Sequence, residues 1–164
     1  MNTNYAGFWL RFVACVIDQI ILSIVRAFAI VPILAAMGIG ISQGMTQDFD
    51  NPDQIMALVA GLAALAGIVS LVSTAIYVLY FTFMESSNLQ ASVGKLALGL
   101  VVTDENGAKL DFGKALVRNL CKILSAMILF IGFIMAGFTD KKQGLHDIIA
   151  KTLVVKKSSA VAPA

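Results

Sequence analysis

Charged residues are scarce in this chain of 164 residues, of which Asp, Glu, Lys and Arg make up only 13%. A soluble domain carries roughly 25% charged residues. Here 59% of the sequence is hydrophobic and the mean hydropathy is +0.86. Two apolar stretches exceed the ~20 residues that a helix needs to cross about 30 Å of hydrocarbon. The composition therefore predicts an integral membrane protein and leaves no room for a soluble catalytic core.

Histidine and cysteine are nearly absent as well. The single histidine, His146, has no second histidine at metal-ligand spacing, and the two cysteines form no C-x-x-C motif. Gly94 and Lys95 resemble the end of a P-loop, but Leu89 stands where that motif requires glycine. We therefore expect no enzyme activity, no metal and no cofactor. The modest net charge of +2 gives no reason to expect a nucleic-acid partner.

The apolar stretches predict an all-α polytopic membrane protein. Residues 7–41 form the first expected transmembrane helix, which Pro32 should kink or end, and residues 55–84 form the second. Residues 123–138 are a third membrane segment, but at about 16 residues they are marginal as a span. This segment either spans the bilayer or is re-entrant.

The distribution of lysine and arginine predicts the orientation. The loop at residues 42–54 carries three aspartates and no basic residue, whereas five basic residues lie within 85–122. The positive-inside rule places the loop outside, and the N-terminus and residues 85–122 in the cytoplasm. Five more lysines follow residues 123–138, and a re-entrant segment keeps them inside, so we favour that alternative. Non-helical backbone at membrane depth must be buried in protein, which requires tight packing or a homo-oligomer.

The region between the second and third segments predicts a small cytoplasmic structure. Residues 98–105, an Asn106–Gly107 turn and residues 108–111 have the pattern of a β-hairpin, to which residues 152–155 could add a strand. Asp111 is placed to cap a helix over residues 112–122. Its basic face would suit anionic lipid, although an ordinary connector explains it equally well. That face comprises Lys114, Arg118 and Lys122.

Asp18 lies inside the first apolar stretch, where a charge is costly and is usually kept for a pathway, a partner or a relay. On a helix, Arg11, Asp18 and Arg26 fall within ~80° of one another. One interpretation is a cation- or proton-coupling site at Asp18. The other is a structural salt bridge from Asp18 to Arg118, Lys95 or Arg11.

The second apolar stretch carries a stripe of hydroxyl groups that could serve Asp18. Ser70, Thr74 and Tyr77 follow i, i+4, i+7 spacing, so they share one helix face. These hydroxyls could solvate Asp18 or a passing cation. Alternatively they bond to their own helix backbone, as serine and threonine often do in membrane helices.

Three ordered blocks carry a resemblance to a known family. They are AGFWLRFVACVIDQIIL at residues 6–22, SVGKLALGLVVTDENGAKLDFGKALVRNL at residues 92–120, and DKKQGLHDIIAKTLVV at residues 140–155. Together they resemble the RDD family of membrane proteins, which is named for one arginine and two aspartates. The resemblance implies that these residues are Arg11, Asp18 and Asp147, with Asp140 a weaker match for the last. It also implies one domain over residues 6–155, followed by a flexible tail at 156–164.

The resemblance implies a bacterial, multi-pass protein of the cell membrane that transports a small ligand or a cation. Members of this family are suspected transporters of unidentified ligands, and one is reported in sodium/proton exchange. Asp18 would then bind the cation or proton and Arg11 would modulate its pKa. Lys95, Arg118, His146 and Asp147 would form a cytoplasmic mouth. The alternative is a non-transporting interaction or assembly protein, whose buried charges are structural.

Overall fold

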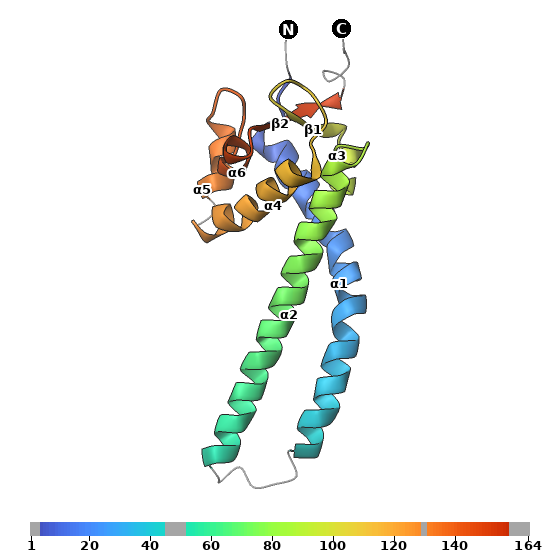
Figure 1. Ribbon diagram of the computed structural model, residues 1–164, viewed down its shortest axis with the longest axis vertical. Coiled ribbons are helices and arrows are strands. Elements are labelled where there is room, and N and C mark those ends of the chain that lie inside the picture. Colours follow the sequence, from blue (N-terminus) through green and yellow to red (C-terminus); the bar gives the residue numbers. More distant parts are fainter. Residues whose placement is uncertain (1–3, 45–51, 129–130, 158–164) are drawn as a thin grey trace. The chain divides into compact units, whose positions relative to one another are not determined.

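The computed structural model describes residues 4–44, 52–128 and 131–157, and in these the chain is mostly helical (Figure 1). The elements are α1 (Phe8–Gly44), α2 (Pro52–Ser86), α3 (Val93–Ala97), β1 (Leu100–Asp104), α4 (Phe112–Met127), α5 (Ile131–Ile134), the 3-10 helix η1 (Met135–Gly137), α6 (Leu145–Ile149) and β2 (Thr152–Lys156). By their contacts they form two compact units, one of residues 1–20 with 78–164 and one of residues 21–77.

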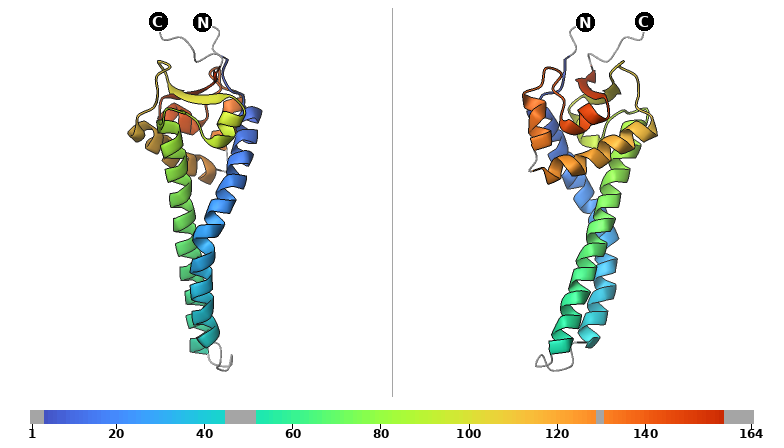
Figure 2. Two further views of the ribbon diagram at one scale, coloured as in Figure 1. Left: turned by 90° about the vertical axis from the view of Figure 1, so that its right-hand side faces the viewer. Right: turned by 60° about the vertical axis from the view of Figure 1, so that its left-hand side comes forward.

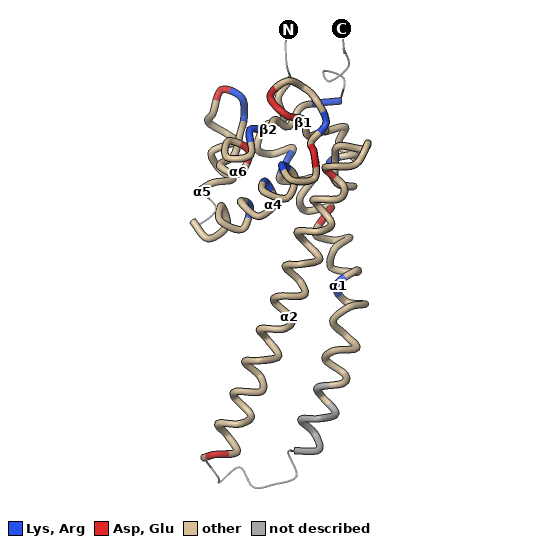
Figure 3. The backbone as a smooth tube through the Cα atoms, in the orientation of Figure 1, with Lys and Arg blue, Asp and Glu red and all other residues tan. Residues whose placement is uncertain are grey.

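Two helices are long and apolar enough to cross a membrane, as the sequence predicts. They are Phe8–Ala36 within α1, and α2 over Pro52–Ser86. Helix α1 continues through Pro32, so this proline does not end it. In the described part of the unit of residues 21–77, Arg26 and Asp53 are the only charged residues, and the other charges in Figure 3 belong to the unit of residues 1–20 and 78–164. Phe28 and Leu71 of this unit are 80% and 74% exposed, as expected of side chains that face lipid.

The third membrane segment is bent rather than straight. Helix α4 begins where predicted, because the Asp111 side chain accepts the Lys114 N–H at 2.7 Å and caps it. It runs on to Met127, beyond the expected end at residue 122. The α5–η1 piece lies at 118° to α4. The predicted segment of residues 123–138 is therefore the end of α4 and all of α5 and η1, with residues 129–130 outside the described residues.

The small sheet differs from the predicted hairpin. Strand β1 pairs antiparallel with β2, in a register that sets Val102 opposite Val154. The predicted return strand at residues 108–111 is not a strand. The turn itself forms, because the Asp104 side chain accepts the N–H groups of Asn106 and Ala108 and Gly107 adopts φ +82°. The chain after the turn instead sends Leu110 into the core and then starts α4.

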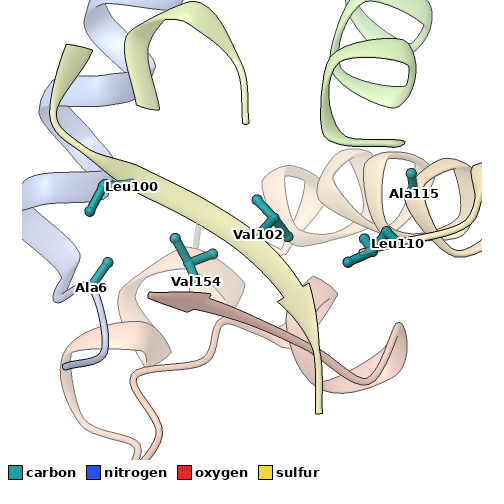
Figure 4. Packing of buried hydrophobic residues seen from close by; sticks show 6 residues of the cluster. All are labelled: Ala6, Leu100, Val102, Leu110, Ala115 and Val154. Atoms are coloured by element: carbon teal, nitrogen blue, oxygen red, sulfur yellow. The ribbon is translucent and has the colours of Figure 1, made fainter. Parts of the chain in front are cut away.

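A compact apolar core explains why β2 is the partner of β1. Leu100 and Val102 from β1 and Val154 from β2 pack against one another (Figure 4). The core is completed by Ala6, Leu110 and Ala115, all fully buried. The Ala6 N–H also bonds to the Val154 carbonyl at 2.9 Å. The β-branched residues of β2 fill this space, whereas residues 108–111 hold one bulky apolar side chain. The core joins the start of α1, the sheet and the start of α4.

Candidate functional site

Asp18 is buried and is held by neutral hydrogen-bond donors. It lies on α1 and is 1% exposed. Its Oδ1 accepts the Tyr80 hydroxyl at 2.9 Å and the Gly94 N–H at 2.8 Å, and its Oδ2 accepts the Ser92 hydroxyl at 2.5 Å. Among the described residues no Lys or Arg lies within 4 Å of this carboxylate. The expected salt bridge from Asp18 to Arg118, Lys95 or Arg11 is therefore wrong.

Helix α3 presents these donors because it packs directly on α1. A Cβ atom on Gly94 would lie 2.1 Å from the Ala14 carbonyl oxygen and 2.9 Å from the Asp18 carboxyl carbon. Only glycine allows this approach, since real Cβ atoms do not come so close to backbone atoms. Gly94 lies in the central block that carries the family resemblance, and the packing gives the physical reason for a glycine there.

Glu85 is the centre of a buried ionic cluster. It lies in the last turn of α2 and is 0% exposed. Its carboxylate lies 2.5 Å from Lys95 Nζ, 2.6 Å from Arg118 Nη1 and 3.3 Å from Lys122 Nζ. The Asn119 side-chain amide donates a further bond at 3.2 Å. Every group that neutralises Glu85 thus comes from α3 or α4.

Asp147 is the second carboxylate of the cluster, at the start of α6. Arg118 Nε donates to its Oδ1 at 2.8 Å, Arg118 Nη2 forms an ion pair with the same oxygen at 2.8 Å, and Arg11 donates to its Oδ2. The Gly144 N–H adds a bond at 3.2 Å. Burial alone would raise the pKa of the Asp147 carboxyl, but Arg118 and Arg11 together hold that pKa well below its usual range.

Arg118 connects the two halves of this cluster. It is 1% exposed and pairs with Glu85 and Asp147 at once. Four basic side chains surround two carboxylates here, and burial of so much charge is costly unless it is paired. The burial of Lys95 lowers the pKa of its ammonium group, although Glu85 opposes this effect. The basic members are Arg11, Lys95, Arg118 and Lys122.

His146 is a buried neutral ring next to the cluster. Its ring lies 4.9 Å from that of Phe133, measured between centroids, and its Nδ1 lies 3.4 Å from Ser125 Oγ. Its Nε2 lies 3.5 Å from Asp147. Burial lowers the pKa of His146 to about 3, more than Asp147 raises it. The ring is therefore uncharged at neutral pH and packs α4, α5 and α6 together; Figure 2 shows α4 and α6 side by side.

The predicted site residues thus separate into groups. Arg11, Lys95, Arg118, His146 and Asp147 meet in the ionic cluster. Asp18 and Gly94 meet at the contact of α1 with α3. A third group, Arg26, Ser70, Thr74 and Tyr77, belongs to the unit of residues 21–77.

The basic face of α4 does not point where the sequence suggested. Arg118 and Lys122 are 1% and 6% exposed, so they cannot lie on lipid headgroups, whereas the Lys114 side chain is 48% exposed. Sequence reasoning also missed Glu85, Tyr80 and Ser92 as site residues. Glu85 offered one signal, since it is the lone carboxylate at the end of the second apolar stretch and the next charged residue along the chain is Lys95.

The fold and these buried charges define a class, an integral membrane protein with two long apolar helices and an ionic cluster packed at their ends. The RDD family profile matches residues 5–151, and the chain belongs to the RDD family. This match covers Arg11, Asp18 and Asp147, and the Arg11–Asp147 pair favours Asp147 over the exposed Asp140 as the second family aspartate.

Curated relatives span nearly the whole chain. The uncharacterized protein YxaI of Bacillus subtilis is 39% identical over 93% of this chain and 97% of its own length. The uncharacterized membrane protein YteJ of the same organism is 26% identical over 92% of this chain and 80% of its own length. A proline-rich antigen homolog of Mycobacterium tuberculosis is 36% identical over 40% of this chain and 28% of its own length. No solved structure matches.

Gly94→Ala tests the contact of α3 with α1. The added methyl group would overlap the Ala14 carbonyl, so we expect a loss of about 1–3 kcal/mol in the free energy of unfolding, as for an overpacked core. The measurement is reversible unfolding in detergent. Gly61→Ala is the matched control, because a Cβ atom there meets nothing within 4 Å. Equal stability of both variants would contradict the packing described.

Arg118→Met tests the cluster. It leaves two buried carboxylates short of a partner, and breaking a buried ion pair costs about 3–5 kcal/mol. Lys114→Met, one turn earlier on α4, removes only a half-exposed side chain that lies 3.9 Å from Asp104. We expect unfolding in detergent to show a large loss for the first variant and less than about 1 kcal/mol for the second. Similar losses would mean that Arg118 does not bridge the carboxylates.

The buried state of His146 predicts acid sensitivity. The folded protein does not take up the proton that the unfolded chain binds below pH 6.5, so stability falls as the pH drops through that value. Between pH 6.5 and 5 the loss is about 2 kcal/mol. The contribution of Asp147 to the free energy of unfolding is lost only near and below its ordinary pKa of 3.8, which lies outside this pH range. His146 is the only histidine, so His146→Gln should remove the pH dependence of the unfolding free energy in this range.

Proposed function

We propose that this protein is a cation-coupled membrane transporter, of the sodium/proton or small-ligand type, in which Asp18 is the coupling group. One observation carries the proposal. Asp18 is a buried carboxylate whose described partners include no basic residue, whereas Glu85 is paired with Arg118 and two lysines, and Asp147 with two arginines. A buried, unneutralised carboxylate within an apolar span is the group that a cation or a proton would neutralise.

The surroundings of Asp18 suit this role chemically. Hydroxyl and carboxylate oxygens are the ligands that hard cations prefer. Tyr80 and Ser92 bring two hydroxyl oxygens to Asp18, and both hydroxyl groups can rotate so that an oxygen lone pair faces a bound cation. With a proton instead of a cation, the neutral carboxyl group keeps at least part of the same hydrogen bonding. In this proposal the ionic cluster is a fixed scaffold that positions α3.

The proposal includes the orientation expected from the charges. The N-terminus and the C-terminus lie in the cytoplasm and the loop at residues 42–54 lies outside, in a multi-pass arrangement in the cell (inner or plasma) membrane. Residues 45–51 of that loop and 158–164 of the tail lie outside the described residues. Exposed lysines would meet anionic lipid at the cytoplasmic face. They are Lys109, Lys114, Lys141, Lys151, Lys156 and Lys157.

Transport also requires a homo-oligomer. Two long helices and one bent segment cannot enclose a pathway, so a second copy must complete it. A second candidate function, a non-transporting interaction or assembly protein, is favoured by a different observation. Arg118 of α4 pairs with Glu85 of α2 and with Asp147 of α6, which is what purely structural charges would do.

The variant Asp18→Asn distinguishes between the two candidate functions. It keeps the shape of the side chain and removes its charge, so we expect proton or sodium flux into proteoliposomes to vanish while the melting temperature and the oligomer stay near those of the wild type. Asp140→Asn is the matched control, because Asp140 is exposed. Its flux should equal that of the wild type.

The other outcomes decide against the proposal. Flux that survives Asp18→Asn would exclude Asp18 as the coupling group. Wild-type protein that carries neither ion under a proton or a sodium gradient would exclude sodium/proton exchange. If the wild type carries neither ion and Asp18→Asn also unfolds or dissociates, the assembly function is favoured.

A further inference from the structure

Helix α4 is amphipathic in the reverse sense to a helix on the surface of a soluble protein. One face is buried, and it carries Ala115, Arg118, Asn119, Lys122 and Ser125. The opposite face is exposed and apolar, with Val117, Leu120 and Leu124 between 46% and 48% exposed and Met127 75% exposed. Arg118 and Lys122 thus point into the protein and the leucines point away from it.

Water cannot be the medium around such a face. Soluble proteins rarely expose a contiguous apolar stripe, and they almost never bury lysine and arginine while leucine faces solvent. In a bilayer the opposite holds, since charged side chains turn to the protein interior and pair there. The stripe continues past α4, where Ile128, Ile131 and Ile134 are 45%, 52% and 46% exposed.

The exposed face of α4 also joins a membrane helix. Phe112 at the start of α4 and Phe83 near the end of α2 lie with their ring centroids 5.4 Å apart, and they are 44% and 59% exposed. Helix α2 is one of the two predicted spans. The apolar surface therefore runs from α2 onto α4. With 16 residues, α4 is about 24 Å long, too short to cross about 30 Å of hydrocarbon.

We propose that α4 and the start of α5 are immersed in the acyl chains of a single leaflet, the one in which α2 ends. The apolar face of α4 contacts hydrocarbon. Its buried face supplies Arg118 and Lys122 to the ionic cluster. This replaces the expectation that the basic face of the helix rests on lipid headgroups. The proposal does not depend on transport, because a structural membrane protein would need the same contact.

Spin labels at Leu120 and Leu124 test the immersion. Single cysteines are placed there in a Cys15→Ala/Cys121→Ala background, and the full-length protein is reconstituted into liposomes at high dilution. Collisions of each nitroxide with oxygen, which concentrates in acyl chains, are compared with collisions with a water-soluble nickel chelate. Leu71→Cys on α2 is the lipid control and Glu105→Cys in an exposed turn is the water control. Melting temperatures verify that each labelled variant is folded.

We expect the ratio of oxygen to nickel accessibility at both α4 positions to match Leu71 and to exceed that of Glu105. A nickel preference like that of Glu105 would place the face in water and overturn the proposal. Shielding from both reagents, with spin–spin broadening, would show that a second copy covers the face, which also overturns it. Two positions one turn apart keep the test decisive if one label perturbs folding.

Discussion

The ion pairs of Arg118 with Glu85 and Asp147 hold together the part of the molecule that carries the site. Glu85 lies in the last turn of α2 and Asp147 in the first turn of α6, and their basic partners offset the cost of burying the two charges. One guanidinium can serve both because its planar fork presents several donors in fixed directions. Arg11 and Lys95 then attach α1 and α3 to the same two carboxylates.

The bilayer explains why the charges converge. An apolar solvent offers no hydration to a lysine or an arginine, so each basic side chain near the membrane must turn inward and find an oxygen. Arg118 and Lys122 follow this constraint on the inner face of α4, whereas Lys114 at the start of the helix is half-exposed and the outer face from Val117 to Met127 is apolar. The sheet follows the ordinary rule of a soluble domain, with Leu100, Val102 and Val154 buried together. The unit of residues 1–20 and 78–164 therefore contains both an apolar core, as in a soluble protein, and a buried ionic cluster, as in a membrane protein.

The sequence predicted local features such as helix positions, but it did not predict contacts between residues far apart in the chain. Hydropathy located both long helices to within three residues at each end, and Asp111 located the start of α4. The hairpin prediction failed because the strand opposite Val102 lies some fifty residues later, where a local turn signal carries no information. The prediction of partners for Asp18 failed for the same reason, since Ser92 and Gly94 are 74 and 76 residues away in the sequence. The family resemblance supplied Arg11 and Asp147 without indicating that they pair.

The three family residues therefore divide into two physical roles. Arg11 and Asp147 neutralise each other, and Arg118 makes their contact part of a larger network. A substitution of either residue therefore lowers the stability of the fold. Asp18 receives hydrogen bonds from Tyr80, Ser92 and Gly94 but no positive charge. These hydrogen bonds hold the carboxylate in place, and in the proposed transporter a mobile cation or a proton would neutralise its charge. In that proposal occupancy changes at Asp18 alone, while the ion pairs of Arg118 that join α2, α4 and α6 stay intact.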